Sequence, residues 1–198
     1  MRSFVLATAN PHKTEEMSAV LSALGIDVAP RPSHVGEVDE TEDTLEGNAL
    51  LKARALAAAT RHVAVADDTG LFVDVLDGRP GVFSARYAGE SATYAQNVEK
   101  LLAEMATHQD RRAHFRTVIA LVSPEGDELV VEGVLYGEIT REPRGANGFG
   151  YDPVFAPDDA SGRTLAELSA SEKNDLSHRA RALRTLAETL AEEPRRFQ

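Results

Sequence analysis

The sequence predicts an α/β protein with a mixed β-sheet, and three observations support this fold class. Short apolar runs that are typical of strands alternate with amphipathic segments that are typical of helices. The turn residues 124–127 separate two apolar runs and predict an antiparallel hairpin. Because the hairpin interrupts the alternation, a uniform Rossmann repeat does not fit the chain.

The N-terminus is predicted to form a strand followed by a capped helix. Residues 3–8 are a short apolar run, and Asn10 and Pro11 suit the N-cap and the first position of a helix. The apolar residues of this helix recur at helical spacing, at Met17, Val20, Leu21 and Leu24. Gly25 is expected to end the helix.

The remaining elements follow the same two patterns. Residues 45–61 are rich in Ala, Leu and basic residues, which favours a helix, and residues 63–66 predict a second short strand. Another amphipathic helix is marked by Tyr94, Val98, Leu101, Leu102 and Met105. Strands are expected at 114–122 and 129–136, on either side of the hairpin turn. The last helix is expected to begin near Asp175. Its apolar side is formed by Leu176, Leu183, Leu186 and Leu190.

Composition limits the classes of function. The chain has 198 residues and a formal net charge of −11, which suits one domain and argues against a basic surface for duplex nucleic acid. It has no cysteine, which excludes disulfides and zinc sites built on thiolates. No apolar run approaches the ~20 residues that cross a bilayer, and the first residues lack the pattern of a signal peptide. We therefore expect a cytoplasmic protein without a membrane partner. Local cations and a divalent metal would have to overcome its repulsion of an anionic substrate.

The first candidate site is the segment Thr8-Ala9-Asn10-Pro11-His12-Lys13. A helix start offers free amides, and the ammonium group of Lys13 could join them around a phosphate. The alternative is a capped surface helix with a solvated lysine. The glycine pattern of a Walker loop is absent.

The second candidate is Asp67-Asp68-Thr69-Gly70, which follows an apolar strand. Two adjacent carboxylates repel each other unless a cation or a shared proton relieves them, and Mg²⁺ prefers such oxygen ligands. Because neighbouring side chains of a strand point to opposite faces, we expect only one of the pair to reach the metal directly. The alternative is a polar turn in which an Asp acts as a cap. The acidic run at 37–46 is expected to be a solvated loop, of which one residue could complete the metal site.

Two further segments could bind a flat ligand. In Gly148-Phe149-Gly150-Tyr151-Asp152-Pro153, the glycines free the backbone to approach a base on which Phe149 stacks. The alternative is a tight turn with Phe149 in the core. Lys173, His178 and Arg179 lie at a predicted helix start, where the helix dipole disfavours cations. An anion or a carbonyl-rich base nearby would explain them, and a solvated helix start is the alternative.

Together these segments resemble the inosine/xanthosine triphosphate pyrophosphatase family, which removes deaminated purine nucleotides. Five motifs in family order carry the resemblance over nearly the whole chain: LATANPHKTEE (6–16), ETEDTLEGNALLKA (40–53), ADDTGLFVDVLDGRPGVFSARYAG (66–89), GFGYDPVF (148–155) and EKNDLSHRARAL (172–183). The resemblance implies one pyrophosphatase domain over residues 1–198, in which a long mixed sheet is flanked by helices that form two lobes with a central cleft. It also implies a homodimer and the Mg²⁺-dependent hydrolysis of ITP, dITP or XTP to the monophosphate and pyrophosphate.

The resemblance further implies roles for individual residues. Thr8, Asn10 and Lys13 would hold the triphosphate, Glu40 and Asp68 would bind the metal, and Asp68 would also be the general base. Thr69 would contact the substrate. The purine pocket would be formed by Phe149, Gly150, Tyr151, Asp152, Lys173, His178 and Arg179. Ala9 and Gly47 stand where the family commonly has Gly and an acid, and neither difference removes a catalytic group.

The implied mechanism is attack on the α-phosphorus by a water that Asp68 activates, with pyrophosphate as the leaving group. Lys13 would neutralise charge on the leaving group, and Arg86 is a further candidate for this role. Donors such as His178 or Arg179 would recognise the 6-oxygen of hypoxanthine or xanthine and reject the 6-amino group of adenine. The alternatives are a pyrophosphatase for modified pyrimidine triphosphates and a purine nucleotide sensor without hydrolysis. The adjacent carboxylates speak against the sensor.

Overall fold

The computed structural model describes residues 3–36, 38–193 and 196–197. Its strands are β1 (Ser3–Leu6), β2 (Asp27–Ala29), β3 (Ala64–Val73), β4 (Pro80–Gly81), β5 (Arg112–Val122), β6 (Glu128–Ile139) and β7 (Phe155–Pro157). Its α-helices are α1 (Pro11–Ala23), α2 (Leu45–Thr60), α3 (Tyr94–Glu104), α4 (Ala170–Leu176) and α5 (His178–Glu192). Short 3-10 helices cover Asp74–Leu76, Ser84–Arg86, Asp152–Val154, Asp158–Ala160 and Leu165–Glu167. In these parts of the chain, no helix is both long and apolar enough to cross a membrane.

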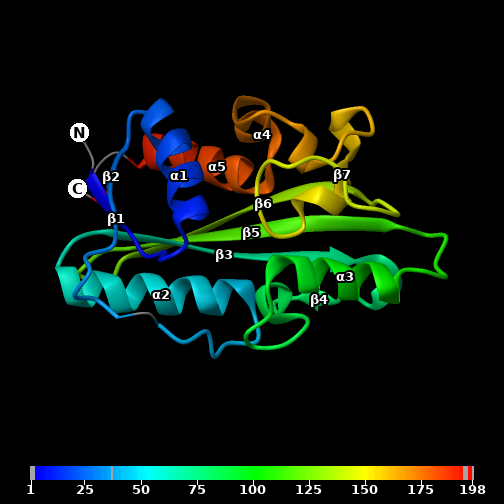
Figure 1. The fold of residues 1–198 in the computed structure, drawn as a ribbon. Coiled ribbons are helices and arrows are strands. Elements are labelled where there is room, and N and C mark those ends of the chain that lie inside the picture. The colour runs from blue at the N-terminus through cyan, green and yellow to red at the C-terminus, as the bar shows by residue number, and fades with distance from the viewer. Residues whose placement is uncertain (1–2, 37, 194–195, 198) are drawn as a thin grey trace. The chain divides into compact units, whose positions relative to one another are not determined.

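The strands form a mixed sheet in the order β2-β1-β3-β5-β6-β7, and β4 pairs with β3 beside this path (Figure 1). Strand β1 is parallel to both β2 and β3, whereas β4 is antiparallel to β3 and β7 is antiparallel to β6. The amide of Ser123 donates to the carbonyl of Asp127 at 2.9 Å, which closes the turn between β5 and β6. The predicted α/β fold with a mixed sheet and a hairpin is therefore confirmed.

The internal contacts divide the chain into two compact units. Unit 1 comprises residues 1–68, 117–133 and 178–198, and unit 2 comprises residues 69–116 and 134–177. The boundaries fall within the long strands β3, β5 and β6, so each of these strands contributes one part to each unit.

In unit 1, helices α1 and α5 cover one face of the strands and helix α2 covers the other (Figure 1). The core under α1 and α5 includes Phe4, Leu6, Met17, Leu21, Val65, Ile119, Leu121, Leu183 and Leu186. Helix α2 buries Leu45, Ala49, Ala53 and Leu56. Each fully buried Leu contributes roughly 1.5–3 kcal/mol relative to an exposed one. The two faces of β3 therefore point toward different helices, which sets the environment of the acidic pair that follows Ala66.

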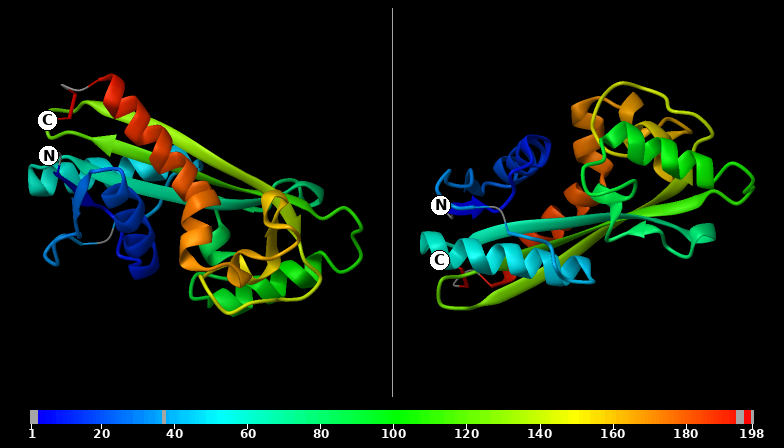
Figure 2. Two further views of the ribbon diagram at one scale, coloured as in Figure 1. Left: turned by 90° about the horizontal axis from the view of Figure 1, so that it is seen from above. Right: turned by 60° about the horizontal axis from the view of Figure 1, so that its bottom comes forward.

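The core of unit 2 lies under helix α3, whose buried residues include Val98 and Leu101, with Met105 just after its end. The rings of Phe115 and Phe155 meet edge to face in this core, with 4.8 Å between their centroids. In the right-hand view of Figure 2, α3 runs beside the yellow-green segment that precedes β7. That segment carries Phe149.

Four predictions of local structure were wrong. Strand β3 does not end before the acidic pair but continues to Val73, because its second half pairs with β4. Gly70 makes this pairing possible, since a side chain there would collide with the carbonyl of Gly81. The last helix is divided into α4 and α5 by Ser177, which has an extended backbone. Tyr94 is 44% exposed and does not join the buried side of α3. Leu24 is likewise exposed and lies just after the end of α1, so it does not join the buried side of that helix.

The predicted start of α1 and the position of α2 are confirmed. Gly25 follows the end of α1 with a φ of +74°, a conformation that suits glycine at this position. The predicted loop at 37–46 is observed as irregular chain from residue 38 to Thr44, and Leu45 begins α2. Position 37 of that run lies outside the described residues.

Candidate active site

The candidate phosphate loop is ordered by its own polar side chains. The side-chain oxygen of Asn10 accepts hydrogen bonds from the amides of His12 at 3.0 Å and Lys13 at 3.5 Å, as an N-cap does. The hydroxyl of Thr8 accepts from the amide of Asn10 at 3.1 Å. Pro11 is the first residue of α1, which fixes the helix start directly after Asn10. The loop therefore fixes the start of α1, from which the side chain of Lys13 reaches Asp67 in β3.

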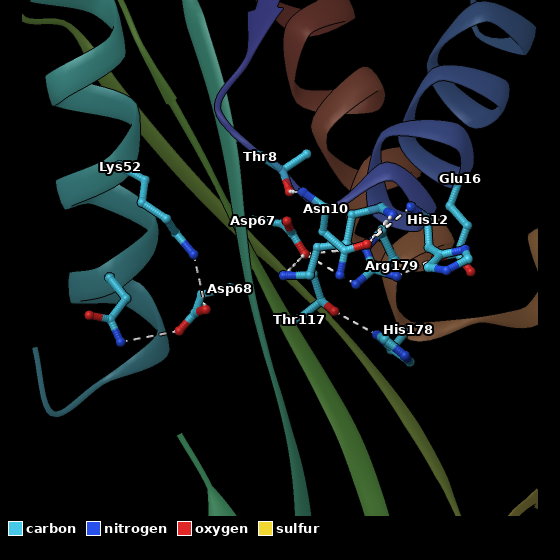
Figure 3. Close-up of polar contacts among 12 residues, drawn as sticks. Thr8, Asn10, His12, Glu16, Lys52, Asp67, Asp68, Thr117, His178 and Arg179 are labelled. Atoms are coloured by element: carbon cyan, nitrogen blue, oxygen red, sulfur yellow. Dashed lines mark hydrogen bonds and ion pairs between the residues drawn. The ribbon is translucent and has the colours of Figure 1, made fainter. Parts of the chain in front are cut away.

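The adjacent carboxylates of Asp67 and Asp68 point to opposite faces of β3 (Figure 3). Both residues are buried, at 2% and 4% exposed. Asp67 faces α1 and α5 and pairs with cations of those helices, whereas Asp68 faces α2 and pairs with a cation of that helix. The strand geometry thus separates two charges that are neighbours in the sequence.

Asp67 is the centre of a buried ion-pair network. Its carboxylate lies 3.0 Å from the ammonium of Lys13 and 3.2 Å from the guanidinium of Arg179, which also pairs with Glu16. Burial by itself would raise the pKa of Asp67, but Lys13, Arg179 and Lys52 together hold it well below its usual range. Asp67 is therefore ionised at neutral pH, and it fixes Lys13 and Arg179 in place.

Asp68 lies in a different environment, against helix α2. One of its oxygens is 3.1 Å from the ammonium of Lys52, and the other accepts a hydrogen bond from the amide group of Asn48 at 3.3 Å. The same ammonium lies 2.6 Å from Glu40. Burial, opposed by Lys52 and reinforced by the charge of Glu40, raises the pKa of Asp68 to about 6. A carboxylate with such a pKa can accept and release a proton near neutral pH.

Glu40 and Asp68 form a site that suits a hard divalent cation. Their oxygens converge on one point, which the Lys52 ammonium fills as a stand-in cation. Burial would raise the pKa of Glu40, but Lys52 holds it below its usual value, so Glu40 offers a charged ligand. Among the described residues, no three His, Asp or Glu side chains gather as a metal cage. Two protein carboxylates, completed by water and phosphate oxygens, are a donor set typical of Mg²⁺.

A second group of candidate residues lies together in unit 2, around Phe149. The ammonium of Lys173 is 2.6 Å from Asp152 and 4.9 Å from the centroid of the Phe149 ring. The carboxylate of Asp152 also accepts from the amide of Phe149 at 2.9 Å. Gly148 makes this hydrogen bond possible, because a side chain at position 148 would collide with the Asp152 carboxylate. Asp152 therefore fixes both Phe149 and Lys173.

The ring of Phe149 lines a surface pocket of about 550 Å³ in unit 2. Tyr94 lies on the same pocket, with its ring centroid 5.9 Å from that of Phe149. Gly150, which has a φ of +64°, also lines it. Tyr151 differs from its neighbours, because it is buried in the core of unit 2 and its hydroxyl donates to the carbonyl of Ser84 at 2.9 Å.

The remaining candidates are distributed over both units. His178 and Arg179 begin α5 in unit 1, as predicted. The prediction that Lys173 lies at the same helix start was wrong, because Ser177 ends a separate helix, α4 of unit 2, in whose last turn Lys173 lies. Thr69 is the first residue of unit 2 and is partly buried in β3. Arg86 of unit 2 lies 3.7 Å from Glu90 and stacks over Phe83.

Sequence reasoning missed Glu16, Asn48 and Lys52. The signal for two of them was present, because Asn48 and Lys52 are four residues apart on the predicted helix and therefore share one face. Nothing in the sequence, however, indicated that this face would lie against Asp68. The contact between Glu16 and Arg179 joins residues that are 163 positions apart.

The fold and these clusters define an α/β protein in which two buried carboxylates, Asp67 and Asp68, pair with cations on opposite faces of one strand. The chain belongs to the Ham1 family, whose model matches residues 4–189. A Thermoanaerobacter protein named dITP/XTP pyrophosphatase is 49% identical over 92% of this chain and 93% of its own length. A Bacillus subtilis protein of the same name is 44% identical over 96% of this chain and 98% of its own length. The structure of a HAM1 protein from Coxiella burnetii is similar with a TM-score of 0.87, at 45% identity, over 97% of this chain and all of that one.

Proposed function

We propose that the chain hydrolyses deaminated purine nucleoside triphosphates, namely dITP, ITP and XTP, to the monophosphate and pyrophosphate. The relatives named dITP/XTP pyrophosphatase match nearly the full chain, which supports this substrate class. The observation that carries the proposal is the buried Asp68, whose pKa is raised to about 6 beside Glu40 and Lys52. A carboxylate in this state can take a proton from water at neutral pH.

The triphosphate is assigned to the loop from Thr8 to Lys13, which comprises Thr8, Ala9, Asn10, Pro11, His12 and Lys13. Its ordered backbone and the Lys13 ammonium, which Asp67 holds at 3.0 Å, support this role. Thr69 follows the general base and is assigned a contact to the substrate. A local cation such as Lys13 is needed for binding, because the net charge of −11 repels a polyanionic substrate at long range.

Glu40 and Asp68 would hold a Mg²⁺ ion, in the place where their oxygens now share the ammonium of Lys52. When bound, this ion would neutralise phosphate charge and lower the pKa of a coordinated water.

The reaction needs one proton transfer and one displacement. Asp68 takes a proton from a water whose oxygen attacks the α-phosphorus, and the bond from that phosphorus to the bridging oxygen breaks in line. Pyrophosphate leaves with the electron pair of that bond, and Lys13 stabilises its charge. Arg86 is a further candidate for this last role.

The base is assigned to Phe149, Gly150, Asp152, Lys173, His178 and Arg179. Phe149 would stack on the purine, which contributes ~1–3 kcal/mol without selecting a base. Asp152 would act by fixing Phe149 and Lys173, and Tyr151 by supporting the loop from the core. Selection would come from a donor such as His178, which matches a 6-oxygen and would be left unpaired by the 6-amino group of adenine. Arg179, which pairs with Asp67 and Glu16, would act by fixing this end of α5.

The experiment is a panel of ITP, dITP, XTP, dUTP, TTP and GTP with the purified chain, in which pyrophosphate release is measured with Mg²⁺ and with EDTA. Rapid release from dITP, ITP and XTP, abolished by EDTA, is the expected result. A preference for a pyrimidine triphosphate would overturn the substrate class, and binding of dITP without release would indicate a sensor.

Three expectations from the resemblance belong to the same proposal. The 198 residues would act as one domain with a cleft between two lobes, the molecule would be a homodimer, and it would work in the cytoplasm. Light scattering of the purified chain tests the dimer, for which a mass near twice 21.4 kDa is expected.

A further inference from the structure

The side chain of His178 contacts Thr117, a residue of β5 that has no part in the proposed reaction. The imidazole is 4% exposed, and its Nδ1 atom lies 2.6 Å from the hydroxyl oxygen of Thr117 in β5 (Figure 3). Thr117 itself is fully buried. A hydrogen bond this short between two buried side chains fixes the orientation of the imidazole ring.

The neighbouring strand fixes the backbone of the same histidine. Gly133 in β6 faces the first turn of α5, and a side chain there would collide with the carbonyl of His178 and the amide of Ala182. Glycine therefore lets the helix start lie directly against the sheet. Strands β5 and β6 thus hold the ring and the backbone of His178 together.

The position of Thr117 in its strand is unusual for a polar residue. The residues that share its face of β5, Ile119 and Leu121, belong to the hydrophobic core under α1 and α5. Another buried threonine, Thr164, donates its hydroxyl to a backbone carbonyl, that of Arg144 at 2.8 Å. At Thr117 the partner is instead an imidazole nitrogen whose protonation the hydroxyl can select.

We propose that Thr117 is a positioning residue for nucleobase selection, because its hydroxyl donates to Nδ1 of His178 and leaves the proton on Nε2. The inference rests on the proposed function, in which His178 recognises the base. With Nδ1 occupied as an acceptor, Nε2–H is a fixed donor. It matches the 6-oxygen of hypoxanthine or xanthine and opposes the 6-amino group of adenine, which also donates. Thr117 would thereby determine part of the preference for deaminated purines without touching the substrate.

The kinetic test compares Thr117→Val, Thr117→Ser and the wild type. The ratio of kcat/KM for dITP to that for dATP should fall about tenfold in Thr117→Val and return in Thr117→Ser, which restores the hydroxyl. Thr164→Val is the matched control, since it also removes a buried hydroxyl but not one that contacts histidine. An unchanged ratio in Thr117→Val, or an equal loss in the control, would overturn the proposal.

A second measurement needs no variant that might fold poorly. The ¹⁵N spectrum of the wild-type His178 ring, assigned by its loss in His178→Asn, should show an unprotonated Nδ1 and a protonated Nε2 at neutral pH. The opposite tautomer would overturn the inference. This result does not depend on turnover, whereas failure of the wild type to hydrolyse dITP would overturn the proposed function itself.

Discussion

Replacement of Asp68 by Asn should make the metal-free protein more stable relative to the wild type at alkaline pH than at acidic pH, while it abolishes turnover. The buried carboxylate has a folded-state pKa of about 6, above the value of 3.8 that is normal for Asp. The folded protein therefore binds this proton more tightly than the unfolded chain. The contribution of this proton to the free energy of unfolding is fully present below pH 3.8 and is lost as the pH rises through 6. Above pH 7 the ionised carboxylate lowers the free energy of unfolding by about 3 kcal/mol, since each unit of difference between the two pKa values corresponds to ~1.4 kcal/mol.

The assay is urea unfolding of the wild type and Asp68→Asn in EDTA at pH 4 and pH 8. The free energy of unfolding of the variant, minus that of the wild type, should increase by about 2 kcal/mol between the two pH values. Any constant effect of the substitution cancels in this comparison. Asp110→Asn is the control, because Asp110 is exposed and Arg112 lowers its pKa to about 2, so its change has the opposite sign. A difference that stays constant or falls with pH for Asp68→Asn would refute the reasoning.

Three other substitutions test separate parts of the site. Phe149→Ala should raise the KM for dITP about tenfold with a smaller change in kcat, because stacking is lost; a protein that unfolds instead would assign Phe149 to the core. Glu40→Gln should weaken activation by Mg²⁺ about tenfold or more in a metal titration of turnover, and unchanged metal dependence would remove Glu40 from the site. Tyr151→Phe should lower the free energy of unfolding, measured in urea, by about 1–2 kcal/mol, because the hydroxyl of Tyr151 donates to the carbonyl of Ser84 in the core. The KM for dITP should be unchanged. A raised KM would contradict that supporting role.

The predictable parts of the fold are those whose conformation is determined by neighbouring residues in the sequence. Asn10 and Pro11 define the start of α1 through capping, which involves only neighbouring residues. The opposite orientations of Asp67 and Asp68 follow from strand geometry alone. Residues 124–127 close the hairpin because their turn preferences agree with the apolar runs on both sides.

The parts that were not predictable depend on contacts between distant segments. Residues 67–70 in the middle of β3 have the composition of a turn. The chain nevertheless continues as a strand, because Leu71 and Phe72 pair with Gly81 and Pro80 of β4. The role of Lys52 depends on the packing of α2 against the face of β3 that carries Asp68. The break at Ser177 was missed because the apolar pattern continues across it, although Ser169 and Glu172 form a capping box that announces α4.

The proposed mechanism depends most directly on the attack of water on the α-phosphorus with Asp68 as the base. Hydrolysis of dITP in ¹⁸O-labelled water, with the products analysed by mass spectrometry, tests this claim. The wild type should place the label in dIMP and leave pyrophosphate unlabelled, and Asp68→Asn should form neither product at a comparable rate. Label in pyrophosphate, release of single phosphates, or full activity of Asp68→Asn would contradict the account.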